Sequence, residues 1–318
     1  MLASSVGLVS GWLLLNRYES LVKHADLLPD GVARLDDNPD SLEGPLNLLL
    51  IGSDYRKGLE NEAWRADTIM VLHIPRSLDR AFVISIPRDL RVEIPRCGES
   101  SESCVDKINA AFAYGGQGKT FDPVGGYRLL AETIHNLIGI QFDAAAIIDF
   151  QGFTKIVGAL GGVQMCVDVQ TVSIHTGTVW QTGCQYFNEH AALDYVRQRD
   201  FPDGDITRER HQQQFLKAIL QQARDVGVLS DPMKFDRILR VASESLTLSS
   251  PHSLPALVLG LRSIRPDDLT LVKLPVTSDW IDGVSYVVPV EGTEAVYNAL
   301  RTDNLEPFIA NNPSLINK

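Results

Sequence analysis

The sequence has little positive charge for its size. Its 318 residues include 29 lysines and arginines against 40 aspartates and glutamates, which gives a formal net charge of -11. Non-specific nucleic-acid binding requires a basic face, so this composition argues against nucleic acid as a partner. The sequence also lacks a helix-turn-helix signature with a basic face, which would support direct transcriptional action. An anion such as phosphate can still bind where positive charge is concentrated locally.

The sequence also lacks an uninterrupted apolar run of the roughly 20 residues that a membrane-spanning helix needs. The segment MLASSVGLVSGWLLLN, residues 1–16, carries no charge, and Arg17 ends it without a basic segment before it. We interpret residues 1–16 as the outer end of a signal anchor, residues 17–44 as a polar stalk, and residues 45–318 as an extracellular domain. An ordinary buried helix at the start of the chain is the alternative.

Cysteine is scarce, with four residues that form two local groups: Cys97 with Cys104, and Cys166 with Cys184. No CxxC spacing occurs and no histidine lies near at zinc-ligand spacing, which argues against a metal site at the cysteines. Four cysteines allow three pairings. Two local disulfides fit an exported protein, whereas free buried thiols would fit a cytosolic one.

The chain does contain several continuous apolar runs with the length of strands buried on both faces. They are LNLLLIGSD (46–54), DTIMVLHI (67–74), AFVISIP (81–87) and FDAAAIID (142–149). Between and after them, apolar residues at helical spacing predict helices over 127–137, 189–197 and 207–226. Alternating strands and helices without repeats or internal linkers predict one α/β domain around a mostly buried sheet.

Charged residues stand at the ends of three of these strands. Asp54 follows the first strand, Asp67 begins the second, and Arg88 and Asp89 follow the third. If the first two strands run antiparallel, the two carboxylates meet, and paired carboxylates beside phosphate oxygens suit Mg²⁺. Turn capping by the aspartates and a surface ion pair of Arg88 with Asp89 are the structural alternatives.

Positive charge is concentrated in YVRQRDFPDGDITRERHQQQF, residues 195–215. Arg197 and Arg199, two apart in an expected extended segment, should point the same way. Asp205 stands where a helix N-cap would, and Arg208 follows on the helix that it begins. Arginine forks and a helix N-terminus bind phosphate oxygens, so the stretch predicts a pyrophosphate site. A solvated charged helix face is the alternative.

At this point the chain resembles the LytR–CpsA–Psr family of bacterial cell-envelope proteins. Blocks that carry the resemblance, in the family's order, include NLLLIGSDYR, WRADTIMVLHI, FVISIPRDLRVEIP, KINAAFAYGG, IDFQGFTKIVGALGGV and ALDYVRQRDFPDGDITRERHQQQFL. The resemblance implies a three-layer α/β/α sandwich with a central mixed sheet and an apolar tunnel for a polyprenyl chain. It also implies a single-pass protein of the cytoplasmic membrane with its catalytic domain outside the cell.

The family's reaction transfers a glycopolymer from a polyprenyl-pyrophosphate carrier to peptidoglycan as a phosphodiester, with Mg²⁺. By the resemblance, Asp54 and Asp67 take the metal positions. The phosphate-binding positions are those of Arg88, Arg197, Arg199, Arg208 and Lys107. The catalytic candidates are Arg88, Asp89, Asp205 and Arg208. One departure is His211, which replaces a second arginine often found three residues after the one matching Arg208, while Arg210 should face elsewhere on the helix.

Two further functions remain open at the level of sequence. A hydrolase would use the same site on a pyrophosphate lipid, with water in place of the sugar acceptor. A non-catalytic regulator or glycan-binding protein would tolerate loss of Asp54 and Arg88, whereas a transferase would not. The sequence does not reveal which glycopolymer is carried.

Overall fold

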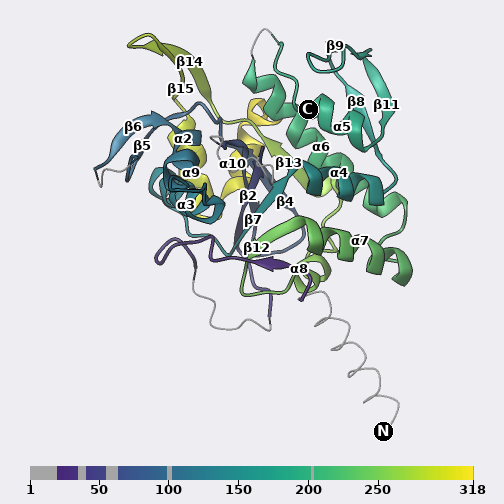
Figure 1. Ribbon diagram of the computed structural model, residues 1–318. Coiled ribbons are helices and arrows are strands. Elements are labelled where there is room, and N and C mark those ends of the chain that lie inside the picture. The colour runs from purple at the N-terminus through teal and green to yellow at the C-terminus, as the bar shows by residue number, and fades with distance from the viewer. Residues whose placement is uncertain (1–19, 35–40, 55–63, 99–101, 202–203, 318) are drawn as a thin grey trace.

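A computed structural model describes residues 20–34, 41–54, 64–98, 102–201 and 204–317, and Figure 1 shows their arrangement. A seven-stranded mixed sheet lies at the centre, in the order β1-β12-β7-β2-β3-β4-β13. Its strands are β1 (Lys23–His24), β2 (Leu46–Ser53), β3 (Ala66–Ile74), β4 (Ala81–Ser85), β7 (Ala144–Asp149), β12 (Leu246–Ser249) and β13 (Leu269–Val272). Four of them coincide with the apolar runs that predicted buried strands.

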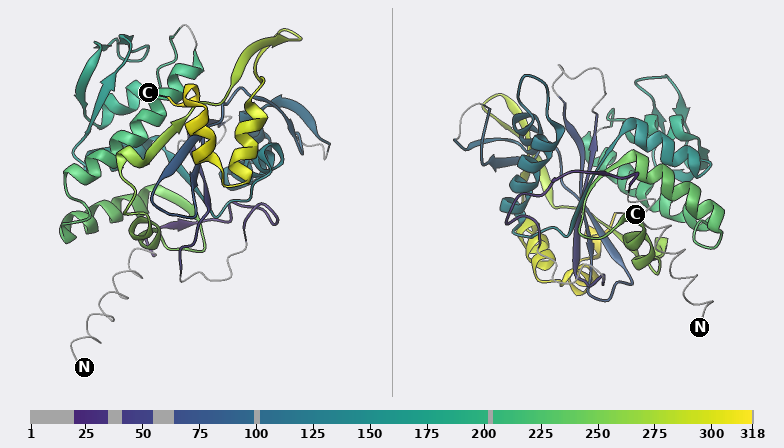
Figure 2. Two further views of the ribbon diagram at one scale, coloured as in Figure 1. Left: turned by 180° about the vertical axis from the view of Figure 1, so that it is seen from behind. Right: turned by 60° about the horizontal axis from the view of Figure 1, so that its bottom comes forward.

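Helices cover both faces of this sheet, so the predicted α/β/α sandwich is confirmed (Figure 2). One face carries α2 (Ile108–Gly115), α3 (Pro123–Ile138), α9 (Thr293–Arg301) and α10 (Leu305–Asn311). The other carries α4 (Phe150–Ala159), α5 (Glu189–Val196), α6 (Asp205–Asp225), α7 (Pro232–Ser245) and α8 (Leu254–Gly260). Two short 3₁₀ helices span Pro266–Asp268 and Pro313–Leu315.

The two faces of the sheet bury separate hydrophobic clusters because side chains alternate along each strand. Leu49 and Ile51 of β2 pack into the cluster beneath α3 and α9, whereas Leu48 packs with Leu216 and Leu220 of α6 on the other face. Strands β2 and β3 are buried along most of their length. Burial on both faces is why they read as continuous apolar runs.

Strand directions bring distant parts of the chain to one end of the sheet. Strands β2 and β3 are antiparallel, with Ser53 opposite Ala66, while β2 and β7 are parallel. Strand β4 runs antiparallel to β3 and parallel to β13. The C-terminal ends of β2, β4, β7 and β13 therefore lie at the same end of the sheet as the N-terminal end of β3. We call this the upper end of the sheet.

Four two-stranded ladders lie outside the central sheet. They pair β5 (Arg91–Ile94) with β6 (Cys104–Lys107), β8 (Val163–Val167) with β11 (Gly183–Phe187), β9 (Thr171–Val172) with β10 (Val179–Trp180), and β14 (Val276–Ile281) with β15 (Val284–Pro289). The predicted disulfides Cys97–Cys104 and Cys166–Cys184 are both present, and the second joins β8 to β11. The β14–β15 hairpin was not predicted.

The segment before residue 45 contributes to the folded domain where it is described. Strand β1 pairs with β12, and Leu27 and Val32 are buried in the main core. Both residues fall in the segment that was predicted to be a polar stalk. The expected signal anchor, residues 1–16, lies outside the described residues. Among the residues that are described, no helix combines the length and apolar character needed to cross a membrane.

Candidate functional site

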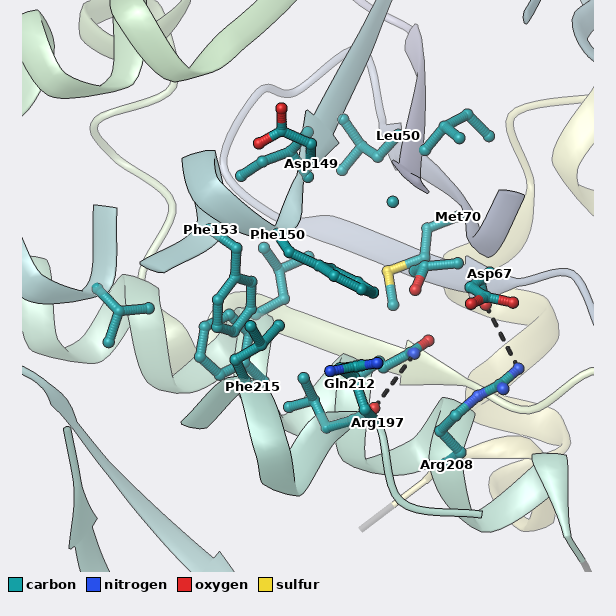
Figure 3. A pocket seen from close by; sticks show the side chains of 18 of the residues that line it. Leu50, Asp67, Met70, Asp149, Phe150, Phe153, Arg197, Arg208, Gln212 and Phe215 are labelled. Atoms are coloured by element: carbon teal, nitrogen blue, oxygen red, sulfur yellow. Dashed lines mark hydrogen bonds between the residues drawn. The ribbon is translucent and has the colours of Figure 1, made fainter. Parts of the chain in front are cut away.

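A cavity of about 460 Å³ lies between the sheet and helices α4, α5 and α6. Most of its wall is apolar, with Leu50 and Met70 from the sheet and Phe150, Phe153 and Phe215 from the helices. Figure 3 shows the phenylalanines on one side of the cavity and Asp67 and Arg208 on the other. The remaining polar lining comes mainly from Arg197, Arg199, Gln212, Thr68, Asp149 and His175. A long apolar wall with charge at one end suits an amphiphilic ligand.

Arginines and aspartates from four separate elements meet at the charged end of this cavity. The Asp67 carboxylate at the start of β3 accepts hydrogen bonds from Arg88 Nη1 at 2.8 Å and Arg199 Nη2 at 3.0 Å. The Asp205 carboxylate accepts one from Arg88 Nε at 2.6 Å and pairs with Arg208 Nη2 at 3.1 Å. Three of the predicted phosphate-binding arginines are therefore gathered around two carboxylates.

Asp205 holds these arginines through its charge and does not cap the helix as predicted. The N-cap of α6 is Gly204, at φ 55°, and Asp205 is the first helical residue. Glycine adopts positive φ without a steric penalty, which lets the chain turn into the helix at this point. Burial works to raise the pKa of Asp205, but the charges of Arg208 and Arg88 outweigh it and hold that pKa below its usual value.

Arg208 is buried yet incompletely hydrogen-bonded. Its side chain is 1% exposed and lines the cavity. Nη2 donates to the Asp67 carbonyl oxygen at 3.3 Å, whereas Nε and Nη1 have no hydrogen-bond partner among the residues that the structure describes. Burial lowers the pKa of Arg208 to about 10, a value at which the guanidinium still carries its charge near neutral pH. A buried cation with two free donors at a cavity wall is a site for an anion.

The two arginines after α5 do not lie as an extended segment would place them. Arg197 is the C-cap of α5, in the right-handed helical region, and its guanidinium lies 4.4 Å from the centre of the Phe150 ring. Arg199 instead reaches Asp67. The two side chains thus have different partners, but Arg197 and Arg199 both line the cavity.

The two predicted metal ligands come together at the upper end of β2 and β3. Asp54 Oδ1 accepts a hydrogen bond from the Arg65 amide at 2.9 Å. The pKa of Asp54 is raised, chiefly by burial and in part by the charge of Asp67. Among the described residues, no three histidine, cysteine, aspartate or glutamate side chains lie together as a metal site. Two interacting carboxylates alone are compatible with Mg²⁺ that takes its other ligands from phosphate and water.

Asp89 and Lys107 form a pair beside the arginine cluster and outside the lining of the cavity. Lys107 Nζ lies 3.2 Å from Asp89 Oδ1, and Arg88 Nε lies 3.9 Å from Asp89 Oδ2. The ammonium group is also 6.0 Å from the centre of the Tyr286 ring on β15. Lys107 therefore faces the β14–β15 hairpin.

His211 and Arg210 share a carboxylate on another face of α6. His211 is fully buried, and its Nε2 lies 2.9 Å from Asp168 Oδ1 and 3.2 Å from the Tyr195 hydroxyl. Arg210 Nη2 lies 2.8 Å from Asp168 Oδ2. His211, which stands where the family often has an arginine, thus belongs to a network with Asp168, the residue after β8, and with Tyr195 of α5. Arg210 does not line the cavity.

Sequence reasoning missed Glu209, which lies directly beside Arg208. Its side chain is half-buried, and its Oε1 atom has no hydrogen-bond partner among the described residues. Burial raises the pKa of Glu209 to about 8, so the carboxyl is mostly protonated at neutral pH. A single glutamate among surface-like residues gives no signal in the sequence; only the packing of α6 against β4 and β13 buries it.

A profile of the LytR_cpsA_psr family matches residues 15–302. The chain belongs to this family, as the motifs indicated.

Relatives and solved structures agree with that assignment. The chain is 33% identical to the probable cell wall biosynthesis protein LcpB of Corynebacterium glutamicum, over 80% of this chain and 61% of that protein. It is 32% identical to the polyisoprenyl-teichoic acid–peptidoglycan teichoic acid transferase TagU of Halalkalibacterium halodurans, over 65% of this chain and 61% of that protein. Each alignment spans less than two thirds of the relative.

The fold is shared with a structure of TagT bound to LI-WTA, at a TM-score of 0.62 and 22% identity. That alignment covers 86% of this chain and 94% of the TagT chain.

Proposed function

We propose that this protein is a phosphotransferase that moves a cell-wall glycopolymer from a polyprenyl-pyrophosphate carrier to a peptidoglycan sugar hydroxyl. The observation that carries the proposal is Arg208, a buried cation with two unbonded donors at the charged end of an apolar cavity. A polyprenyl pyrophosphate has the matching shape, with an apolar chain joined to a doubly phosphorylated head. The name of TagU supports this substrate class, and the name of LcpB supports a role in cell wall biosynthesis.

The cavity is proposed to hold the polyprenyl chain. Phe153 and Phe215 stack at 4.5 Å between ring centres along its wall, away from the arginines. Burying an apolar chain there is favourable by about 25 cal/mol per Å² of apolar surface removed from water. The pyrophosphate would then lie against Arg208, Arg199 and Arg197.

The reaction that follows is a phosphoryl transfer with balanced bonds. The acceptor hydroxyl attacks the phosphorus that carries the polymer, a new P–O bond forms, and the bond to the bridging oxygen of polyprenyl phosphate breaks. Catalysis of such transfers consists mainly of positioning and of neutralising charge on the leaving oxygens. Arg208 and Arg88 would supply that charge, while Asp67 and Asp205 fix their guanidinium groups.

The proton released by the acceptor hydroxyl needs a base. Asp205 is a poor candidate because its lowered pKa reflects binding to arginines that it positions. Asp89 lies beside Arg88 and outside the lining of the cavity, and it pairs with Lys107 at 3.2 Å. We assign the base role to Asp89, because this lysine is its closest cation and Arg88 lies 3.9 Å away, whereas two arginines hold Asp205 at 2.6 Å and 3.1 Å.

Mg²⁺ is proposed to be held by Asp54 and Asp67. When bound, it would neutralise charge on the pyrophosphate and so add to the effect of the arginines. Asp54→Asn should then weaken Mg²⁺ binding measured by calorimetry in the presence of inorganic pyrophosphate. Asp143→Asn, at the opposite end of β2, is the control, and equal Mg²⁺ affinity in wild type and Asp54→Asn would contradict the assignment.

Titration with a short-chain polyprenyl pyrophosphate tests the donor site. Arg208→Ala should weaken binding by tenfold or more, because charge-assisted hydrogen bonds contribute about 1.5–3 kcal/mol each. Arg208→Lys should restore little, since an ammonium group cannot form the arginine fork. Arg240→Ala, on the outer helix α7, is the control. Wild-type affinity in Arg208→Ala would refute the proposed donor site.

The choice between transfer and hydrolysis rests on the products. Incubation of the lipid-linked polymer with and without peptidoglycan should release polyprenyl phosphate efficiently only when the acceptor is present. Equal release without peptidoglycan would identify a hydrolase acting at the same site.

A further inference from the structure

The proposed reaction joins two substrates, and the cavity accounts for only one of them. The cavity lies against α4, α5 and α6, on one side of the arginine cluster. Arg88 follows β4 at the upper end of the sheet. Asp89 lies beside Arg88 and pairs with Lys107, and neither Asp89 nor Lys107 lines the cavity. The side chains of Arg88, Asp89 and Lys107 are 13%, 24% and 28% exposed, so a second substrate can contact the cluster on this side, apart from the cavity.

The β14–β15 hairpin borders this second side. It rises from the upper end of β13 and projects from the body of the protein next to β5 and β6 (Figures 1 and 2). The amide of Val287 on β15 donates to the Asp89 carbonyl oxygen at 2.9 Å, which ties the base of the hairpin to the residue after Arg88. Val287 is itself buried in the main core. The hairpin is thus fixed to the site at its base and free at its tip.

An aromatic ring and two cations meet at this base. Arg91 Cζ and Lys107 Nζ lie 5.9 Å and 6.0 Å from the centre of the Tyr286 ring. Lys107 also pairs with Asp89, which in turn lies 3.9 Å from Arg88. The Asp89 carboxylate therefore links this group to the arginine cluster. Arg91 is exposed. The base therefore offers a ring face and positive charge on a chain that is otherwise strongly acidic.

The outer part of the hairpin carries a second aromatic residue. Trp280 is 73% exposed, and its cross-strand partner is Ser285. Because side chains alternate across a two-stranded ribbon, Trp280 and Ser285 share one face while Asp279 and Tyr286 share the other. The hairpin thus carries an exposed ring, Trp280, on one face and a half-buried ring, Tyr286, on the other, with short hydrogen-bonding side chains beside them.

Resting on the proposed function, we propose that the β14–β15 hairpin and its base form the binding surface for the acceptor glycan strand. Sugar rings present apolar C–H faces that pack on aromatic rings, and hydroxyl groups that serine and aspartate can bond. Carboxylates on the acceptor would meet Lys107 and Arg91. The core of a protein–protein interface is more apolar than its surroundings, whereas the cross-strand neighbour of Trp280 is a serine.

Cosedimentation with purified peptidoglycan sacculi tests this surface directly. Trp280→Ala and Tyr286→Ala should each weaken sacculus binding about fivefold to tenfold, the loss expected when an aromatic contact of an interface is removed. Binding of short-chain polyprenyl pyrophosphate should stay at the wild-type level in both. Met233→Ala is the matched control, since Met233 is a large apolar side chain on α7 that is 82% exposed.

The outcomes separate this surface from the donor site. Arg208→Ala should lose lipid binding and keep sacculus binding. If Arg208→Ala keeps both lipid binding and sacculus binding, the proposed donor site is wrong. The glycan surface is then tested only by Trp280→Ala and Tyr286→Ala. Wild-type sacculus binding by Trp280→Ala, whose side chain has little packing to lose, would overturn the proposal even if Tyr286→Ala is unstable.

Discussion

The two ends of the central sheet each hold buried charged and polar side chains, and the two groups differ in how completely they are bonded. At the lower end, His73 Nδ1 lies 2.8 Å from Asn47 Oδ1 and His73 Nε2 lies 3.0 Å from Asp303 Oδ1. Asn47 Nδ2 donates to the Gln141 carbonyl oxygen at 3.1 Å. At the upper end, Arg208 leaves Nε and Nη1 without partners.

This difference separates a structural network from a ligand site. An unpaired buried donor costs about 1–3 kcal/mol, so a protein keeps one only where something else repays the cost. The His73 network is closed by protein groups and serves the fold. The Arg208 cluster borders a cavity and keeps two donors that no described protein group uses, which is why we assign it to an anionic ligand.

The largest effect on folding is expected at the closed network. His73→Ala would leave a cavity and remove the partners of Asn47 and Asp303, so the free energy of unfolding should fall by about 2–4 kcal/mol. Urea denaturation measures this loss. His190→Ala, at an 82% exposed side chain on α5, should leave stability unchanged. If His73→Ala also weakened polyprenyl-pyrophosphate binding specifically, the distinction between the two ends would fail.

The opposite response is expected at the open cluster. Arg208→Met removes a buried charge with two unbonded donors and retains much of the side-chain volume, while Asp205 loses Arg208 but keeps Arg88 as a partner at 2.6 Å. The free energy of unfolding should therefore stay unchanged or rise by about 1–2 kcal/mol. The thermal stabilisation that polyprenyl pyrophosphate gives to the wild type should disappear. A loss of stability as large as that of His73→Ala would show that Arg208 is structural.

The fold could be predicted from sequence where burial shapes composition. Strands β2, β3 and β4 are buried on both faces, and so they appear as apolar runs. The β14–β15 hairpin is mostly exposed, so its composition carries no such signal. Strand β12 was missed because Leu246–Ser249 is too short to show a period.

The site could be predicted only in part, because its contacts connect distant residues. Residue types and motifs identified the arginines and aspartates, but Arg88 and Asp205 are 117 positions apart and their pairing depends on topology. Local rules placed Asp205 at the N-cap and Arg197 in an extended segment. The glycine at 204 takes the cap, and the end of α5 includes Arg197, so both local expectations were wrong.

An effect on stability that depends on pH is expected at Glu209. Its pKa is raised by burial to about 8 in the folded protein, from 4.5 in the unfolded chain. The unfolded chain therefore loses this proton first, and the contribution of Glu209 to stability falls as pH rises from about 4.5 to 8. Glu209→Gln should remove this loss and gain on the order of 1–3 kcal/mol relative to wild type at pH 8, with little difference at pH 4. Urea denaturation at both pH values tests it, and a gain that is equal at the two would contradict a raised pKa.

The smallest effect is expected at Arg210, two positions from Arg208 and on another face of α6. Its guanidinium pairs with Asp168 at 2.8 Å, and Asp168 keeps His211 as a partner at 2.9 Å when the arginine is removed. Partly exposed pairs contribute about 0–1 kcal/mol, so Arg210→Ala should barely change the free energy of unfolding. Because Arg210 does not line the cavity, its variant should also bind polyprenyl pyrophosphate within about twofold of wild type, against tenfold or more for Arg208→Ala. Calorimetric titration of both variants with the same lipid makes the comparison. Equal losses would mean that the arginines of α6 act as a diffuse positive patch and that the open donors of Arg208 are not the site of binding.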